Sequence, residues 1–158
     1  MTQYGLGYDI HRLAKGRRLF LGGVLIPHKK GLLGHSDADV LLHAVCDSLL
    51  GAIGERDIGY HFPVGSAAYK DISSLILLKK VHELLSKKKY RVNNLDTVVV
   101  AEAPKIGPYI SKMKKNIAGI LKIDEKKIGI KATTNEKVGL IGSGRAIAAF
   151  SIASVKKG

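Results

Sequence analysis

An apolar segment in the first third of the chain carries three ionisable residues at regular spacing. Asp39, His43 and Asp47 are four residues apart, so they would lie on one face of a helix. The residues around them, from Val40 to Leu50, are almost all apolar, which predicts that this helix is buried. A polar stripe on a buried helix needs a partner, a metal or a ligand, because an unpaired polar group in the interior costs free energy. On the stripe alone, a histidine held by a carboxylate in a polar core is the simpler interpretation.

A second pair of polar residues lies near the N-terminus. Residues Tyr4 to Leu13 alternate and favour β structure, so they predict a strand on which Asp9 and His11 share one face. Together with His43 they offer one carboxylate and two imidazoles, which are ligands that zinc accepts. Three protein ligands leave a fourth position open, as a catalytic zinc requires. The alternative is a strand that carries two surface polar residues.

Two further stretches could bind an anionic, hydroxylated ligand. A predicted strand ends at Thr133 and Thr134 and is followed by Glu136. Threonine hydroxyls and a carboxylate at a strand end can bind a phosphate together with a hard cation. The loop after the central helix contains Asp57 and Gly59, which could hold a polyol through a carboxylate and backbone groups. The simpler interpretations are a threonine-rich strand exit with a helix cap, and a plain connecting loop.

The elements that must position these residues follow from spacing and from turn residues. Ser36 and Asp39 have the spacing of an N-terminal capping pair, so the central helix should begin there and end near Gly51 or Gly54. Only some helices separate neighbouring strands, which predicts an α/β (α+β) chain with a mixed sheet. A length of 158 residues suits one domain over residues 1–158. The other predicted elements are a hairpin over 17–26 broken at Gly22-Gly23, loops over 27–34 and 55–65, helices over 73–86 and from Pro108, and strands over 95–102, 126–134 and 146–155.

Charge and cysteine content narrow the function classes. The net charge is +13, but the lysines form scattered doublets and one triplet with few aromatic residues between them. This favours a solvated surface over a nucleic-acid-binding one, although it would attract an anionic small molecule. Cys46 is the only cysteine, and its place on the buried helix indicates an inert core thiol. With no basic-then-apolar leader and no long apolar span, we expect a cytoplasmic protein without a membrane helix.

An ordered set of motifs spreads over nearly the whole chain. In order and spacing, this set closely resembles the 2-C-methyl-D-erythritol 2,4-cyclodiphosphate synthase family of the non-mevalonate isoprenoid pathway. Any one motif alone would be weak, whereas the ordered set is specific. The motifs are Gly7-Tyr8-Asp9-Ile10-His11-Arg12-Leu13, Gly34-His35-Ser36-Asp37-Ala38-Asp39-Val40-Leu41-Leu42-His43-Ala44, Asp57-Ile58-Gly59, His61-Phe62-Pro63, Ala103-Pro104-Lys105 and Lys131-Ala132-Thr133-Thr134-Asn135-Glu136.

The resemblance implies an activity, a fold and an assembly. Members of that family are phosphorus–oxygen lyases that convert 4-diphosphocytidyl-2-C-methyl-D-erythritol 2-phosphate into 2-C-methyl-D-erythritol 2,4-cyclodiphosphate and CMP. The 2-phosphate of the substrate attacks its β-phosphorus, and CMP leaves. The implied fold is a mixed β-sheet with helices packed on one face. The implied assembly is a homotrimer with active sites between neighbouring subunits.

The same resemblance implies roles for individual residues. Asp9, His11 and His43 would hold zinc, and Glu136 would help to hold magnesium or manganese against the substrate phosphates. The residues implied to stabilise the transition state are His35 and Thr134. The implied substrate-binding set is Asp9, His11, His35, Ser36, Asp57, Ile58, Gly59, Phe62, Ala101, Pro104, Lys105, Ile106, Thr133, Thr134, Glu136 and Leu140.

Two other classes fit parts of the pattern. A zinc hydrolase, in which zinc-bound water attacks a phosphate ester, would give a linear product. A basic nucleic-acid-binding module predicts a steep salt dependence of affinity, but it leaves the zinc-type ligands unexplained, so no nucleic-acid partner is expected. Because Asp39 and Asp47 share the helix face of His43, we also hypothesise that they support the zinc ligands from outside.

Overall fold

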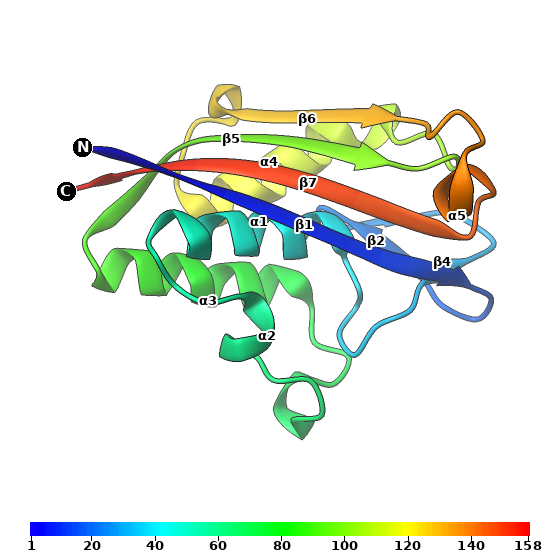
Figure 1. The fold of residues 1–158 in the computed structure, drawn as a ribbon, viewed down its shortest axis with the longest axis horizontal. Coiled ribbons are helices and arrows are strands. Elements are labelled where there is room, and N and C mark those ends of the chain that lie inside the picture. The colour runs from blue at the N-terminus through cyan, green and yellow to red at the C-terminus, as the bar shows by residue number, and fades with distance from the viewer.

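The computed structural model describes residues 1–158, and a mixed five-stranded sheet runs through its length (Figure 1). The strand order is β4-β1-β7-β5-β6. β5 and β6 are parallel, whereas the other neighbours are antiparallel, so the predicted mixed sheet is confirmed. The strands are β1 (Thr2–Ala14), β4 (Gly31–Leu32), β5 (Tyr90–Val100), β6 (Ile128–Thr133) and β7 (Ala146–Lys157).

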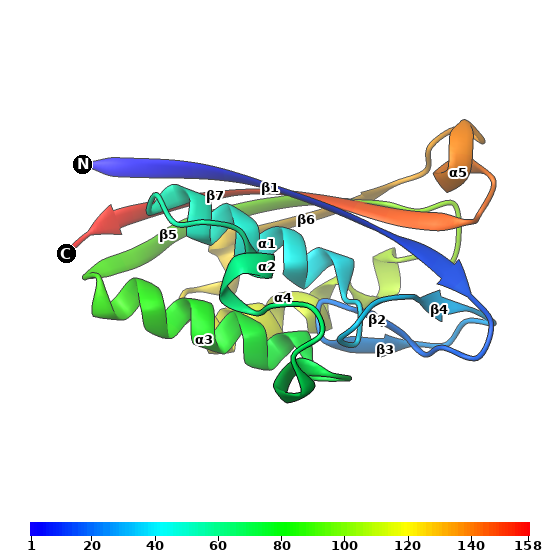
Figure 2. The ribbon, with the colours of Figure 1, turned by 60° about the horizontal axis from the view of Figure 1, so that its bottom comes forward.

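Three helices cover one face of this sheet (Figure 2). They are α1 (Val40–Ala52), α3 (Ser74–Lys87) and α4 (Ile110–Leu121). α1 packs directly on β1 and β7, α3 packs against α1, and α4 packs against α3. The apolar core lies between these elements and includes Cys46, whose burial raises the pKa of the thiol well above its ordinary value. None of the helices has the length and apolar character needed to span a membrane.

The shorter elements account for most differences from the predicted layout. The predicted hairpin is confirmed as β2 (Leu19–Leu21) and β3 (Val24–Ile26). The predicted loops contain β4 and α2 (Ile58–His61), and α5 (Gly139–Gly142) was not predicted at all, because such short elements show no period. β5 begins earlier than predicted, since a register shift at Val92 and Asn94 interrupts its alternation. Short 3₁₀ turns lie at Ala67–Tyr69, Gly107–Tyr109 and Glu125–Lys127.

The start of α1 differs from the predicted capping pair. Asp39 itself is the N-cap, and its side chain accepts a hydrogen bond of 3.1 Å from the N–H of Leu42. Ser36 lies outside the helix, and its hydroxyl accepts a hydrogen bond from the N–H of Ala38. Aspartate is as strong a cap as serine, so the spacing alone does not decide which of the two begins the helix.

Two glycines on β1 let α1 approach the sheet closely. A Cβ atom at Gly5 or Gly7 would lie 2.0 or 1.9 Å from a backbone carbonyl oxygen of α1. No residue with a side chain fits at either position, so helix backbone rests directly on strand backbone. This approach brings His43 on α1 beside Asp9 on β1.

The opposite face of the sheet is exposed and apolar along its central strands. Because successive side chains of a strand alternate between faces, the side chains on this face point away from α1. The rings of Tyr8 and Phe150 pack on each other there, with centroids 4.9 Å apart. A contiguous apolar row of this kind is typical of an interaction surface. The row comprises Tyr4, Leu6, Tyr8, Ile10, Phe150 and Ile152.

Candidate active site

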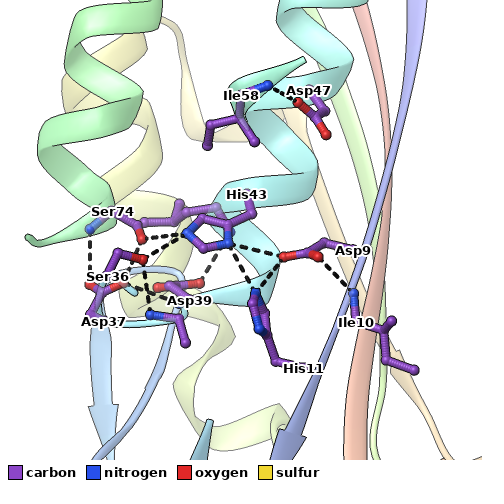
Figure 3. Close-up of polar contacts among 12 residues, drawn as sticks. Asp9, Ile10, His11, Ser36, Asp37, Asp39, His43, Asp47, Ile58 and Ser74 are labelled. Carbon is purple, nitrogen blue, oxygen red and sulfur yellow. Dashed lines mark hydrogen bonds and ion pairs between the residues drawn. The ribbon is translucent and has the colours of Figure 1, made fainter. Parts of the chain in front are cut away.

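Asp9, His11 and His43 converge on one point between β1 and α1 (Figure 3). Asp9 and His11 come from β1, and His43 comes from the first turn of α1. The Oδ2 atom of Asp9 lies 2.8 Å from Nε2 of His11 and 3.0 Å from Nδ1 of His43. The two imidazole nitrogens are 3.2 Å apart. The structure therefore brings together the three residues that the sequence predicts as one metal site.

The chemistry of this Asp9–His11–His43 cluster fits a divalent metal ion. Two imidazole nitrogens and one carboxylate oxygen form a ligand set that zinc accepts, with a fourth position free. Tetrahedral ligands bound at about 2.0–2.2 Å lie about 3.3 Å from one another. The spacings in the cluster, from 2.8 to 3.2 Å, are close to that value. A metal-capable group is therefore present at this point.

The carboxyl group of Asp9 stays ionised far below neutral pH. Burial raises its pKa, but its contacts with the rings of His11 and His43 outweigh burial and lower the pKa to about 2. For His11, burial lowers the pKa, whereas the hydrogen bond and the charge of Asp9 raise it more, so its net shift is upward. A metal cation would replace the proton that the carboxylate shares with the ring of His11.

A cavity of about 220 Å³ opens beside the cluster. Its wall includes His35 and Ser36 from the loop before α1. It also includes Ile58 and Gly59 of α2, and Phe62 directly after that helix. All five belong to the substrate-binding set expected from the resemblance, so the structure places part of that set against the metal-capable cluster.

The position of α2 is fixed from α1. One carboxylate oxygen of Asp47 accepts a hydrogen bond of 2.7 Å from the N–H of Ile58, and burial raises the pKa of Asp47. Asp57 directly precedes α2 and occupies its N-cap position, but it does not line the cavity. Asp47 makes no hydrogen bond to the cluster, so the hypothesis that it supports a zinc ligand directly is wrong. It holds the backbone of the cavity wall instead.

Asp39 also has a structural task. Its carboxylate accepts hydrogen bonds from the N–H groups of Gly22, Gly23 and Leu42, which ties the β2–β3 hairpin to the start of α1. The side chain is fully buried, and burial raises its pKa to about 6. Its carboxylate oxygens are directed at these backbone groups, and His43 bonds to Asp39 only through the helical hydrogen bond from its N–H to the backbone carbonyl oxygen. The hypothesis that the Asp39 side chain supports this ligand directly is therefore also wrong.

Outside the cluster, the side chain of His43 has two serines as hydrogen-bond partners (Figure 3). Its Nε2 atom lies 3.1 Å from Oγ of Ser36 and 3.0 Å from Oγ of Ser74. Ser74 is the first residue of α3 and also contacts Asp37. The sequence analysis missed Ser74, which lies 31 residues from His43, because a serine is not a metal-ligand type that would link it to a distant histidine. The only sequence feature that marks Ser74 is the pair of serines, Ser73 and Ser74, at the start of a predicted helix.

The remaining predicted residues gather at the carboxyl ends of β5 and β6. These parallel strands end side by side, with Val100 opposite Thr133. The N–H of Ala101 donates to the carbonyl oxygen of Thr133 at 2.9 Å, and the hydroxyl of Thr134 donates to the carboxylate of Glu136 at 3.1 Å. None of the residues in this strand-end group lines the cavity. The group comprises Ala101, Pro104, Lys105, Ile106, Thr133, Thr134, Glu136 and Leu140.

Curated proteins of known name match the chain over almost its whole length. The model of the YgbB family matches residues 2–156. The 2-C-methyl-D-erythritol 2,4-cyclodiphosphate synthase of Alkaliphilus metalliredigens is 55% identical over 151 residues, which are 96% of this chain and 95% of the relative. The enzyme of the same name from Bacteroides thetaiotaomicron is 52% identical over 153 residues, with 97% and 96% covered.

Solved structures share the fold. The bifunctional IspDF of Campylobacter jejuni superposes with a TM-score of 0.96 and 37% identity over 100% of this chain, which spans 43% of that longer protein. A CDP complex of IspF from Plasmodium falciparum superposes with a TM-score of 0.86 and 38% identity, over 99% of this chain and 97% of the other. The chain therefore belongs to the YgbB family, together with the 2-C-methyl-D-erythritol 2,4-cyclodiphosphate synthases that it matches.

Proposed function

We propose that this chain converts 4-diphosphocytidyl-2-C-methyl-D-erythritol 2-phosphate into 2-C-methyl-D-erythritol 2,4-cyclodiphosphate and CMP, as a lyase of non-mevalonate isoprenoid biosynthesis. The observation that carries the proposal is the Asp9–His11–His43 cluster against a cavity lined by His35 and Ser36, in a member of this family. The names of the relatives support it. The CDP complex of one relative fits a cytidine-diphosphate-linked substrate.

The cluster and Glu136 are assigned to two different ions. Zinc would bind at Asp9, His11 and His43, and magnesium or manganese would lie between Glu136 and the substrate phosphates. The nucleophile and the electrophile are both phosphates, so their repulsion is the main obstacle to reaction. Bound divalent ions would neutralise this charge and favour an in-line geometry. Because both phosphates belong to one bound molecule, proximity is supplied by binding and no side-chain nucleophile is needed.

The polar residues of the cavity wall are suited to bind phosphate. Ser36 lines the cavity beside the cluster, and its hydroxyl would donate to a phosphate oxygen. His35 is held by a contact of 3.1 Å between its Nε2 atom and the carbonyl oxygen of Ser66, which orients the ring in the wall. His35 and Thr134 would stabilise the charge that develops on the phosphates in the transition state.

The other assignments divide the substrate between the residues at α2 and the strand-end group. The erythritol part would bind along α2, whose backbone is held by Asp47. The cytidine part would bind in the strand-end group, largely through backbone atoms. The residues assigned to erythritol are Asp57, Ile58, Gly59 and Phe62; those assigned to cytidine are Ala101, Pro104, Lys105 and Ile106; and Thr133 and Leu140 complete the set.

The distance between the Asp9–His11–His43 cluster and the strand-end group within one chain favours a homotrimer with active sites at the subunit interfaces. Ile10, between the two ligands on β1, is separated from Val100 by β7, and Thr133 lies one strand further. Three strand spacings of about 4.8 Å thus lie between β1, which carries two ligands of the cluster, and β6, whose end leads into Thr134 and Glu136. A neighbouring subunit could supply these residues, and the exposed apolar row on β1 and β7 offers it a contact surface.

The assembly is tested by placing a charge on the apolar row. Leu6 is 68% exposed, so Leu6→Asp should leave the monomer folded while preventing association and turnover. Ile76→Asp is the matched control, because Ile76 on α3 is also exposed, at 46%, but lies on the helical side of the sheet. Light scattering should give a trimer for the unaltered protein and the control, and a monomer for Leu6→Asp. A monomeric unaltered protein that is active would refute the shared site.

The wider setting follows from the same assignment. Residues 1–158 would form one cyclodiphosphate synthase domain, working in the cytoplasm on a small nucleotide-linked substrate. No membrane or nucleic-acid partner is part of the proposal, and the lysine-rich surface would serve to attract the anionic substrate.

Product analysis tests the reaction directly. The purified protein is given the diphosphocytidyl methylerythritol phosphate substrate with zinc and magnesium, and the double variant Asp9→Asn, His43→Ala serves as the control. CMP together with the cyclic diphosphate, both absent with the variant, is the expected result. A linear 2,4-bisphosphate released together with CMP would instead indicate the zinc hydrolase, in which water replaces the internal phosphate as the nucleophile.

A further inference from the structure

We propose that Ser74 and Asp37 are positioning residues for His43, and that they hold its Nδ1 lone pair toward the metal. The inference rests on the proposed function, because it assumes that the Asp9–His11–His43 cluster binds zinc. Histidine ligands are commonly held by a carboxylate or carbonyl on their other nitrogen. In this chain a serine stands between the histidine and the carboxylate.

The contacts form a continuous line from Asp37 to the cluster (Figure 3). The hydroxyl of Ser74 donates to one oxygen of Asp37 at 2.5 Å, and the N–H of Ser74 donates to the other at 2.9 Å. Oγ of Ser74 lies 3.0 Å from Nε2 of His43. Nδ1 on the far side of the same ring faces Asp9 and His11.

The direction of these hydrogen bonds follows from proton counting. A carboxylate only accepts hydrogen bonds, so the single hydroxyl proton of Ser74 must be directed to Asp37. Ser74 is fully buried, so no solvent proton competes with this arrangement. The oxygen of Ser74 can therefore only accept from His43, which places the proton of that ring on Nε2. A neutral imidazole with its proton on Nε2 has its lone pair on Nδ1, as a metal ligand at this position requires.

The same arrangement sets the role of Ser36. Its oxygen accepts from the N–H of Ala38 at 3.2 Å and shares the Nε2 proton of His43 at 3.1 Å. Since both contacts use its lone pairs, the hydroxyl proton of Ser36 remains free. Ser36 lines the cavity, so this proton is available to an anionic oxygen of the substrate. Ser74 thus orients the metal ligand, while Ser36 is left to donate to phosphate.

The test is the zinc dissociation constant of the metal-free protein, measured by competition with a chelating dye. Ser74→Ala should weaken zinc binding by about 10- to 100-fold, which is the usual effect of losing such a partner. Ser73→Ala is the matched control. Ser73 caps the same helix by accepting from the N–H of Leu75 but does not touch His43, so this variant should bind zinc as the unaltered protein does.

Asp37→Asn is a second variant that tests the same inference if Ser74→Ala fails to fold. One amide oxygen cannot accept at both positions that the carboxylate oxygens now occupy, so zinc binding should again weaken. Unchanged zinc affinity in Ser74→Ala, or an equal loss in Ser73→Ala, would overturn the inference. An unaltered protein that binds no zinc would instead refute the metal site of the proposed function, so the two failures are distinguishable.

Discussion

Replacing Gly7 by alanine should disrupt the metal-capable cluster without touching any of its residues. A Cβ atom at position 7 would lie 1.9 Å from the carbonyl oxygen of Ala44 and 2.7 Å from the nitrogen of Ser48. Both atoms belong to the backbone of α1, so no side-chain rotation can relieve the clash. The helix must instead move away from β1, and His43 moves with it because it directly precedes Ala44.

The size of the movement follows from the geometry. Real Cβ atoms essentially never lie closer than 3.0 Å to such an atom, so α1 must shift by about 1 Å. Metal–ligand distances tolerate only about 0.2 Å, and His43 would therefore be withdrawn from Asp9 and His11. Since losing an outer partner of a ligand already costs about 10- to 100-fold in metal affinity, Gly7→Ala should weaken zinc binding by more than about 100-fold.

The same variant should also lose stability. Overpacking of a tight contact typically costs about 1–3 kcal/mol, and each kcal/mol lowers the Tm of a chain of this length by about 2–4 °C. Gly51→Ala is the control, because a Cβ there would lie 3.9 Å from its nearest neighbour outside the helix, and alanine favours a helix interior over glycine. It should bind zinc normally with an equal or higher Tm. Unchanged zinc affinity and Tm in Gly7→Ala would refute the requirement for close approach.

Three further outcomes are expected. The zinc affinity of the metal-free protein should still rise with pH above 6.5. Burial lowers the pKa of His11, but Asp9 outweighs burial and raises this pKa above its ordinary value, so zinc must displace a proton there. Zinc titrations at several pH values check this. Cys46 should react with a thiol reagent only in denaturant, since it is buried and its pKa is raised. Asp47→Ala should raise KM about 2- to 10-fold, by loss of the hydrogen bond to Ile58, and zinc affinity should be unchanged.

The sequence predicts the cluster because Asp9, His11 and His43 are residue types that zinc accepts as ligands, and because local periods indicate the face on which each one lies. A spacing of two residues on a strand places Asp9 and His11 on one face. The burial of α1 leaves His43 as a polar side chain that needs a partner. The ordered motifs then identify the family, and the matched relatives confirm it. The mixed sheet follows for a similar reason, since it depends on which elements alternate along the chain.

Contacts between distant segments could not be predicted from such periods. Ser74 reaches His43 only because the start of α3 is held by Asp37, in the loop before α1. Likewise, Asp39 has the helical spacing of a residue beside His43, but the β2–β3 hairpin places two backbone N–H groups on its oxygens. In each case the partner is supplied by a segment whose position depends on the whole fold.

The carboxylates around the start of α1 show why residue type and spacing do not fix a role. Asp9 faces two imidazoles, Asp37 faces a serine hydroxyl, Asp39 faces backbone donors of a hairpin and of its own helix, and Asp47 faces the first N–H of α2. Only Asp9 has imidazole lone pairs beside it that could share a cation. The other three each satisfy hydrogen-bond donors that would otherwise be buried without a partner, and in doing so they fix the segments that form the cluster and the cavity. The task of each acid is set by the donors that the fold directs toward it.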